Sequence, residues 1–128
     1  MSSRYPAVCL ALMAAACTSA TQEQACTLIG CSDGLVVRVE AAPEGTTTIE
    51  LKRPFRSPVV LTCTGPEHCA GGIQFEDQTP AHAIITVTSG DRVKSIESDL
   101  EYTKSRPNGP GCEPECRQAS VTLVLPPA

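Results

Sequence analysis

The sequence has no tryptophan, two tyrosines and two phenylalanines, and it carries no excess of positive charge. Its 10 lysines and arginines face 14 acidic residues, so the net charge is −4. Proteins that bind nucleic acids need a clustered basic surface for phosphates and aromatic side chains on which bases stack. Both are in short supply here, and we therefore expect no nucleic-acid partner.

Long hydrophobic runs are also absent. The longest apolar run, Ala7 to Ala16, rises only ~15 Å as a helix, about half of the ~30 Å hydrocarbon core of a bilayer. This run is too short for a transmembrane helix, and it follows the positively charged Arg4. The pattern is typical of an export signal peptide, which we place at residues 1–16.

Motifs for catalysis are missing as well. The sequence contains no GxSxG, SxxK, HExxH or phosphate-binding loop, and the only histidines are His68 and His82. Each histidine lies in a polar or Pro-flanked stretch that is typical of a solvated loop or a surface rim. We therefore predict no catalytic residues, no cofactor and no resident metal.

Small residues stand directly before a cysteine at Ala14-Ala15-Ala16-Cys17. This arrangement resembles the lipobox of bacterial lipoproteins, although Ala14 stands where that family most often has leucine. The resemblance implies cleavage before Cys17 and attachment of acyl chains, such as palmitate, to its thiol. Two or three acyl chains anchor a protein stably. Residues 17–25 would then be the lipid attachment site and a polar tether.

An alternative cleavage site follows Ala20, and its use would discard Cys17 and release the protein in secreted form. If Cys17 is retained, Thr18 follows it instead of the aspartate that resembles an inner-membrane retention signal. By that resemblance, we expect the outer membrane or cell surface as the destination.

Beyond the tether, apolar residues recur with a period of two, as in half-buried β-strands. Turn residues, chiefly proline and glycine, separate the runs. The alternating runs are 35–40, 47–52, 59–64, 73–75, 83–88, 100–103 and 119–125. We predict that residues 26–128 form one all-β domain, an antiparallel β-sandwich of about seven strands, immunoglobulin-like or transthyretin-like.

Eight cysteines indicate an oxidising compartment. Cys9 is removed with the signal and Cys17 is the lipid candidate. The other six predict disulfides: Cys26, Cys31, Cys63, Cys69, Cys112 and Cys116. The simplest pairing is local, which gives 26–31, 63–69 and 112–116. A rival pairing joins Cys31 to Cys112 or Cys116 and fastens the two ends of the domain together.

Two further clusters offer weaker interpretations. A zinc site from Cys63, His68, Cys69, Cys112 and Cys116 is disfavoured, because the spacing matches no zinc ribbon and exported cysteines oxidise. Acidic residues 97, 99 and 101 would share one strand face, which suggests either weak Ca²⁺ binding or a solvent-facing strand.

One loop combines positive charge with an aromatic ring. Lys52, Arg53 and Arg56 surround Pro54-Phe55 in a proline-rich stretch. Such a loop is suited to lipid headgroups or an acidic partner, although most short basic loops are simply solvated.

Taken with the Cys17 motif, the entry sequence 29–35 and the loop 108–112 resemble small bacterial cell-envelope lipoproteins with one cysteine-bearing β-sandwich. The resemblance implies a non-enzymatic, lipid-anchored binding or structural module, with the membrane and an envelope protein as partners. We expect contact through Thr64–Gly72 and Arg106–Arg117, since rigid scaffolds present function on loops. The alternative is a secreted inhibitor or effector that uses the rigid stretch Pro107–Pro114.

Overall fold

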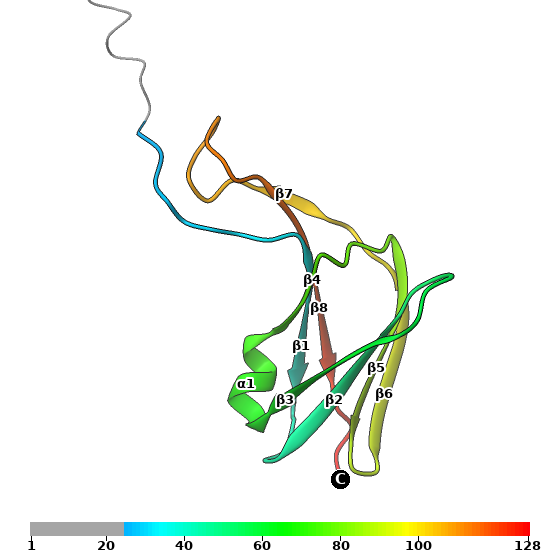
Figure 1. Cartoon of the computed structure of the whole chain (residues 1–128). Coiled ribbons are helices and arrows are strands. Elements are labelled where there is room, and N and C mark those ends of the chain that lie inside the picture. The colour runs from blue at the N-terminus through cyan, green and yellow to red at the C-terminus, as the bar shows by residue number, and fades with distance from the viewer. Residues whose placement is uncertain (1–24) are drawn as a thin grey trace, which may run out of the picture.

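The structure, a computed structural model, describes residues 25–128, which form two four-stranded sheets packed face to face (Figure 1). The predicted signal peptide, Cys17 and most of the tether lie outside the described residues. The strands are β1 (Gly34–Glu40), β2 (Thr46–Lys52), β3 (Val59–Thr64), β4 (Ile73–Glu76), β5 (His82–Ser89), β6 (Arg92–Asp99), β7 (Thr103–Ser105) and β8 (Cys116–Val124), with helix α1 (Gly65–Gly71) between β3 and β4. The first sheet has the order β4-β1-β8-β7 and the second β3-β2-β5-β6. The predicted all-β sandwich is confirmed.

The core follows the alternation of the sequence. Every second residue of the central strands is buried between the sheets, and Phe75 is the largest side chain buried there. The other large members are Leu35, Val37, Val39, Ile49, Leu51, Ile85, Val87, Leu123 and Leu125. One face of each sheet therefore supplies the hydrophobic stabilisation, and the other face meets water.

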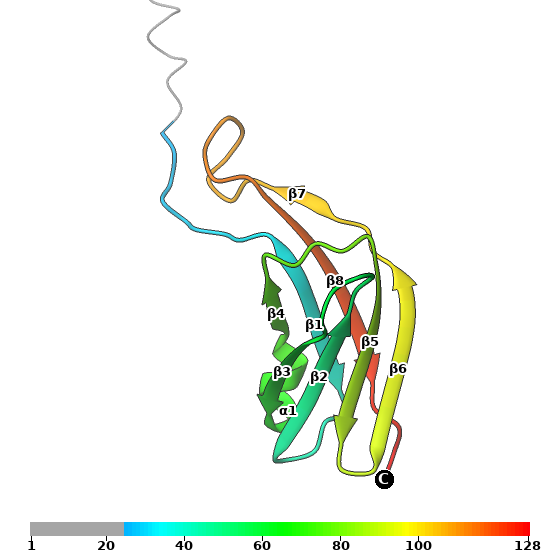
Figure 2. The ribbon, with the colours of Figure 1, turned by 45° about the vertical axis from the view of Figure 1, so that its right-hand side comes forward.

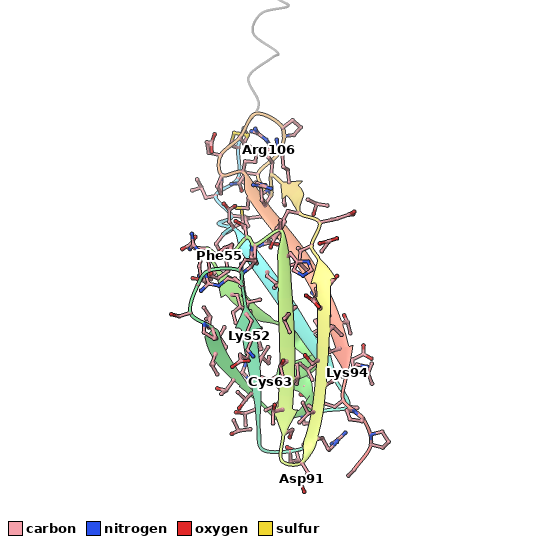
Figure 3. All side chains as sticks on the ribbon, turned by 90° about the vertical axis from the view of Figure 1, so that its right-hand side faces the viewer. Lys52, Phe55, Cys63, Asp91, Lys94 and Arg106 are labelled. Atoms are coloured by element: carbon pink, nitrogen blue, oxygen red, sulfur yellow. A yellow bond between two sulfur atoms is a disulfide. The ribbon has the colours of Figure 1, made fainter. Side chains whose placement is uncertain are left out.

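One strand pair departs from the antiparallel expectation. β1 and β8 run parallel over their whole length, from Gly34 opposite Gln118 to Glu40 opposite Val124. Both strands therefore start at the same end of the sandwich, which we call the tether end because residues 25–33 enter there. The opposite end, where β1 stops and β2 begins, is the far end. Arg106 and Asp91 mark the two ends in Figure 3.

The β4–β5 and β2–β3 loops also lie at the tether end. Glu76, the last residue of β4, pairs with Gly34, and the Asp77 N–H donates to the Asp33 carbonyl at 2.9 Å. Lys52, the last residue of β2, pairs with Ile84 near the start of β5. The β2–β3 loop (residues 53–58) and the β4–β5 loop (residues 77–81) are consequently neighbours.

Two elements were not predicted as such. Helix α1 occupies the stretch expected to be a loop, and it starts at the far end, where the Gly65 N–H donates to the Gly45 carbonyl. The Thr64 N–H donates to His68 Nδ1 at 3.0 Å, so the ring of His68 takes up a backbone donor at the helix start. β6 pairs with β5 along its length, and the strand expected at 100–103 is replaced by the short β7.

All six cysteines predicted to form disulfides do so, but two of the three local pairings are wrong. Cys63 bonds to Cys69, as the local pairing has it. The other bonds join Cys26 to Cys112 and Cys31 to Cys116, so the rival pairing is correct for Cys31–Cys116. The reason is the parallel β1–β8 pair, which brings the segments before both strands side by side.

These two bonds hold what we call the disulfide lobe, residues 25–33 and 106–116, which extends beyond the sandwich (Figure 2). Asn108 lies inside it and is 7% exposed. Its Oδ1 accepts hydrogen bonds from Thr27 Oγ1 and the Ile29 N–H, and its Nδ2 donates to the carbonyls of Ile29 and Glu113. The lobe is thus cross-linked by covalent bonds and by one amide side chain.

Candidate functional site

The two loops predicted as a shared contact surface lie apart. Thr64–Gly72 contains the helix that starts at the far end, whereas residues 106–116 belong to the lobe at the tether end (Figure 1). The expectation that they line one end of the sandwich is therefore wrong. The cause is chain direction: β3 runs from the tether end to the far end, so α1 follows it there.

A pocket of about 360 Å³ lies instead between the β2–β3 and β4–β5 loops. Two arginines, one histidine and one aspartate supply its charges, and prolines shape its walls. The lining residues are Arg53, Pro54, Arg56, Asp77, Gln78, Thr79, Pro80, Ala81 and His82.

Arg53 is fixed across the pocket. Its Nη1 donates to Gln78 Oε1 in the β4–β5 loop, and its Nη2 donates to the Ser57 carbonyl at 2.7 Å. Its Nε is buried and has no hydrogen-bond partner. An unsatisfied buried donor costs about 1–3 kcal/mol, and more where the group is charged.

The arginines also keep their positive charge uncompensated. Among residues 25–128, the ion pairs are Lys52–Glu50, Arg106–Glu115 and those of His82 with Glu97 and Asp99. Neither Arg53 nor Arg56 takes part in one, and Asp77 is the only acidic residue in the lining.

His82 lies at the start of β5 and is held from β6. Its Nδ1 is 2.8 Å from Asp99 Oδ1, and its Nε2 is 3.1 Å from Glu97 Oε1. The hydrogen bond with Asp99, followed by that with Glu97, raises the pKa of His82 above its ordinary 6.5. The ring thus bridges two carboxylates, and any positive charge on His82 is offset by Asp99 and Glu97.

Backbone conformation sets two loop residues apart. Phe55 has a φ of 58° and Asp77 a φ of 59°, in the left-handed region that aspartate tolerates and a bulky residue rarely adopts. Phe55 is also completely exposed, at 105% of its reference area. Strain of this kind is often kept at functional sites. The β2–β3 loop therefore combines a strained, exposed ring with the arginines of the pocket.

The other sequence candidates do not form a metal centre. Cys63 and Cys69 are bonded to each other, while Cys112 and Cys116 are bonded within the lobe, so the four thiols proposed for zinc are oxidised and separated. Glu97 and Asp99 lie on β6 and contact His82 on β5, but Glu101 lies beyond the strand. Over residues 25–128, no three ligating side chains are placed to hold a metal ion.

The arrangement is suited to a small anionic group. Guanidinium groups bind carboxylates and phosphates through paired hydrogen bonds, and the two arginines of the lining supply the complementary charge. Comparison of the chain with protein-family models, curated proteins and solved structures found no match. Its function is therefore inferred from the pocket and from the surface around it.

Sequence analysis identified part of this site. It singled out Arg53 and Arg56 as basic loop residues and placed His82 on a surface rim, which agrees with its half-exposed side chain. It did not join them, because residues 53 and 82 meet only through the pairing of β2 with β5. Gln78 carried no signal beyond its place in a turn.

Proposed function

We propose that this protein is a lipid-anchored, non-enzymatic binding module of the bacterial cell envelope, attached through Cys17. In this proposal, the pocket between the β2–β3 and β4–β5 loops binds an anionic group, a carboxylate or a phosphate. Arg53 and Arg56 supply the charge, and His82 forms part of the pocket wall.

The observation that carries the proposal is a pair of arginines that line one pocket without a carboxylate partner. A second argument is position, because the chain from Cys17 enters the domain at the same end. The eight Cα-to-Cα steps from Cys17 to Ala25 span at most ~29 Å when extended, so a lipid at Cys17 keeps this end close to a bilayer.

Location is consistent with this function. The three disulfides are typical of an exported protein in an oxidising compartment. No helix within residues 25–128 has the length and apolarity that crossing a membrane requires. The residue after Cys17, Thr18, supports an outer-membrane or cell-surface destination within the proposal.

Anion binding is tested by NMR titration of the oxidised mature chain with inorganic phosphate, pyrophosphate and acetate. We expect shifts of the Arg53, Gln78 and His82 signals, and about tenfold weaker binding by Arg53→Gln or Arg56→Gln, since each removes a charge-assisted hydrogen bond. Lys94→Gln is the matched control, because Lys94 is exposed and lies toward the far end (Figure 3). Absence of binding, or equal binding by all variants, would contradict the pocket's role.

The anchor is tested separately by mass spectrometry of the protein purified from its native host. We expect a diacylated or triacylated Cys17 as the first residue. A protein that begins at unmodified Thr21 would instead favour the secreted alternative.

That alternative, a secreted inhibitor or effector, has one structural observation in its favour. Within residues 107–114, Cys112 is bonded to Cys26 and Asn108 donates to the Glu113 carbonyl, and Cys116 just beyond is bonded to Cys31. The loop is therefore held rigid, as an inhibitory loop must be. Binding of the mature chain to immobilised proteases, lost on substitution of the exposed Pro110, would support it.

A further inference from the structure

We propose that the β2–β3 loop is a second membrane contact, in which Phe55 inserts into the headgroup region of an anionic bilayer and the adjacent basic residues pair with lipid phosphates. This goes beyond the proposed function, since it requires neither an occupied pocket nor an acyl chain on Cys17.

The first argument is the presentation of Phe55. The ring is completely exposed and does not belong to the pocket lining, although Pro54 and Arg56 on either side of it do. Exposure of an aromatic ring forgoes the stabilisation that burial would provide, and its φ of 58° adds strain. A membrane that receives the ring would recover the first of these costs.

The second argument is rigidity. Pro54 and Pro58 fix φ on both sides of Phe55, and the Arg53 guanidinium ties the loop to Ser57 and Gln78. A loop that is already held in place loses little conformational entropy when it docks.

The third argument is charge. Lys52, Arg53 and Arg56 flank Phe55 in the sequence, and basic residues near an anionic surface are attracted to it. Lys52 shares its charge with Glu50 at 3.6 Å, so Arg56, which is exposed and outside any ion pair among residues 25–128, is the strongest candidate for a phosphate contact. An aromatic ring with flanking cations matches the interface of a bilayer.

The fourth argument is the position of the chain. Residues 25–33 leave the domain at the same end, and they expose two further apolar side chains, Leu28 at 100% and Ile29 at 56%. Residues 1–24 continue from there. The exposed apolar groups of the tether end thus lie where the chain would approach a membrane.

A bilayer fits this surface better than a protein partner does. A stable protein interface buries about 1,200–2,000 Å² around a packed apolar centre, whereas the loop offers one ring among charges. A bilayer requires only an inserted side chain and a few phosphate contacts.

The absence of tryptophan allows a direct test with Phe55→Trp, which makes residue 55 the only indole in the protein. The mature chain (residues 17–128) with Cys17→Ser has no lipid and is mixed with vesicles of phosphatidylcholine alone or with phosphatidylglycerol. We expect a blue shift and quenching by brominated lipid with the anionic vesicles only. Val93→Trp is the control, because Val93 is 52% exposed on β6 but lies toward the far end, and its emission is expected to stay unchanged.

Vesicle partitioning of the Cys17→Ser chain then measures how much the Phe55 ring and the Arg56 charge each contribute to membrane binding. We expect Phe55→Ala to lower the partition coefficient about tenfold and Arg56→Gln about fivefold at low salt, while Val93→Ala and Lys94→Gln leave it unchanged. Far-UV circular dichroism confirms that the exposed substitutions leave the fold intact. No binding, equal binding to neutral vesicles, or equal binding by all variants would overturn the proposal. Because Phe55 lies outside the pocket lining, Phe55→Ala is expected to bind anions normally, so the two proposals fail separately.

Discussion

In the sandwich body, strands from two sheets bury side chains such as Leu35, Ile49 and Phe75 completely, whereas in the disulfide lobe residues 25–30 are all exposed. The body is stabilised by removal of apolar surface from water. The lobe has Cys112, Cys116 and Asn108 as its buried residues, and it depends on covalent bonds and on one amide. One short chain thus uses two means of stabilisation, with hydrophobic burial dominant in the body, which adds the Cys63–Cys69 bond, and cross-links dominant in the lobe.

The difference also bears on function. The charged pocket and the exposed ring of Phe55 lie at the tether end, where loops predominate. Loops cannot bury much surface, so their position relative to the body must be fixed by other means. In the β2–β3 loop, the Arg53 guanidinium provides this fixation through its hydrogen bonds with Ser57 and Gln78.

The contrast between the sandwich body and the disulfide lobe is tested most strongly by removing the two long disulfides. Cys26–Cys112 and Cys31–Cys116 span 86 and 85 residues, so either bond closes nearly the same loop. When one pair is replaced by alanine, the other bond still closes the long loop, so chain entropy predicts a loss of about 3 kcal/mol in the free energy of unfolding. When both pairs are replaced, the predicted loss is about 7 kcal/mol. Urea unfolding followed by circular dichroism measures this. If removal of one pair lowers the free energy of unfolding as much as removal of both, the remaining bond does not compensate for the missing one.

Asn108→Ala tests whether the lobe opens independently of the body. The substitution removes all four hydrogen bonds of the side chain, and we expect a loss of about 2 kcal/mol. Amide hydrogen exchange is the sharper measurement, because the Ile29 N–H should lose protection while amides of β2 keep theirs. Equal loss in both regions would show that lobe and body unfold as one unit.

Thr47→Val tests the body alone. Thr47 is completely buried on β2, and its Oγ1 has no hydrogen-bond partner. Replacement of the hydroxyl by a methyl group should stabilise the protein by about 1 kcal/mol and raise Tm by about 4–8 °C. Thr62→Val, on the exposed face of β3, serves as control and should change Tm little. A lower Tm for Thr47→Val would mean that the hydroxyl is satisfied after all.

The smallest expected effect concerns His82, at the boundary between body and pocket. Its carboxylate partners Asp99 and Glu97 raise its pKa, so its contribution to stability is complete below about pH 6.5 and is lost as pH rises through the raised value. His82→Gln should therefore reduce stability more at about pH 5.5 than at about pH 8.5. Urea midpoints at the two pH values provide the measurement, and a pH-independent difference would contradict it.

The central strands could be predicted from sequence because each has one buried and one exposed face. β6 could not, since Arg92–Asp99 is an edge strand whose only large inward-facing apolar residue is Ile96. Helix α1 is too short to show helical periodicity. Disulfide pairing and the pocket both depend on which strands are neighbours, and a single sequence does not reveal that the first and last strands run parallel. The basic loop was recognised, but its meeting with His82 was not.

The parallel β1–β8 pair and the two long disulfides also determine how the protein carries mechanical tension. Consider a pull between Ala25 and Ala128. The force passes from Cys26 across its bond to Cys112, and then along β8 to the far end (Figure 1). The Cys31–Cys116 bond provides a second covalent route through residues 27–30, and both routes bypass the chain between Cys31 and Cys112, which contains β1 to β7. Only β8, held by its neighbours β1 and β7, can be pulled from the sheet. A protein tethered at this end would therefore keep its pocket and its Phe55 loop intact under load.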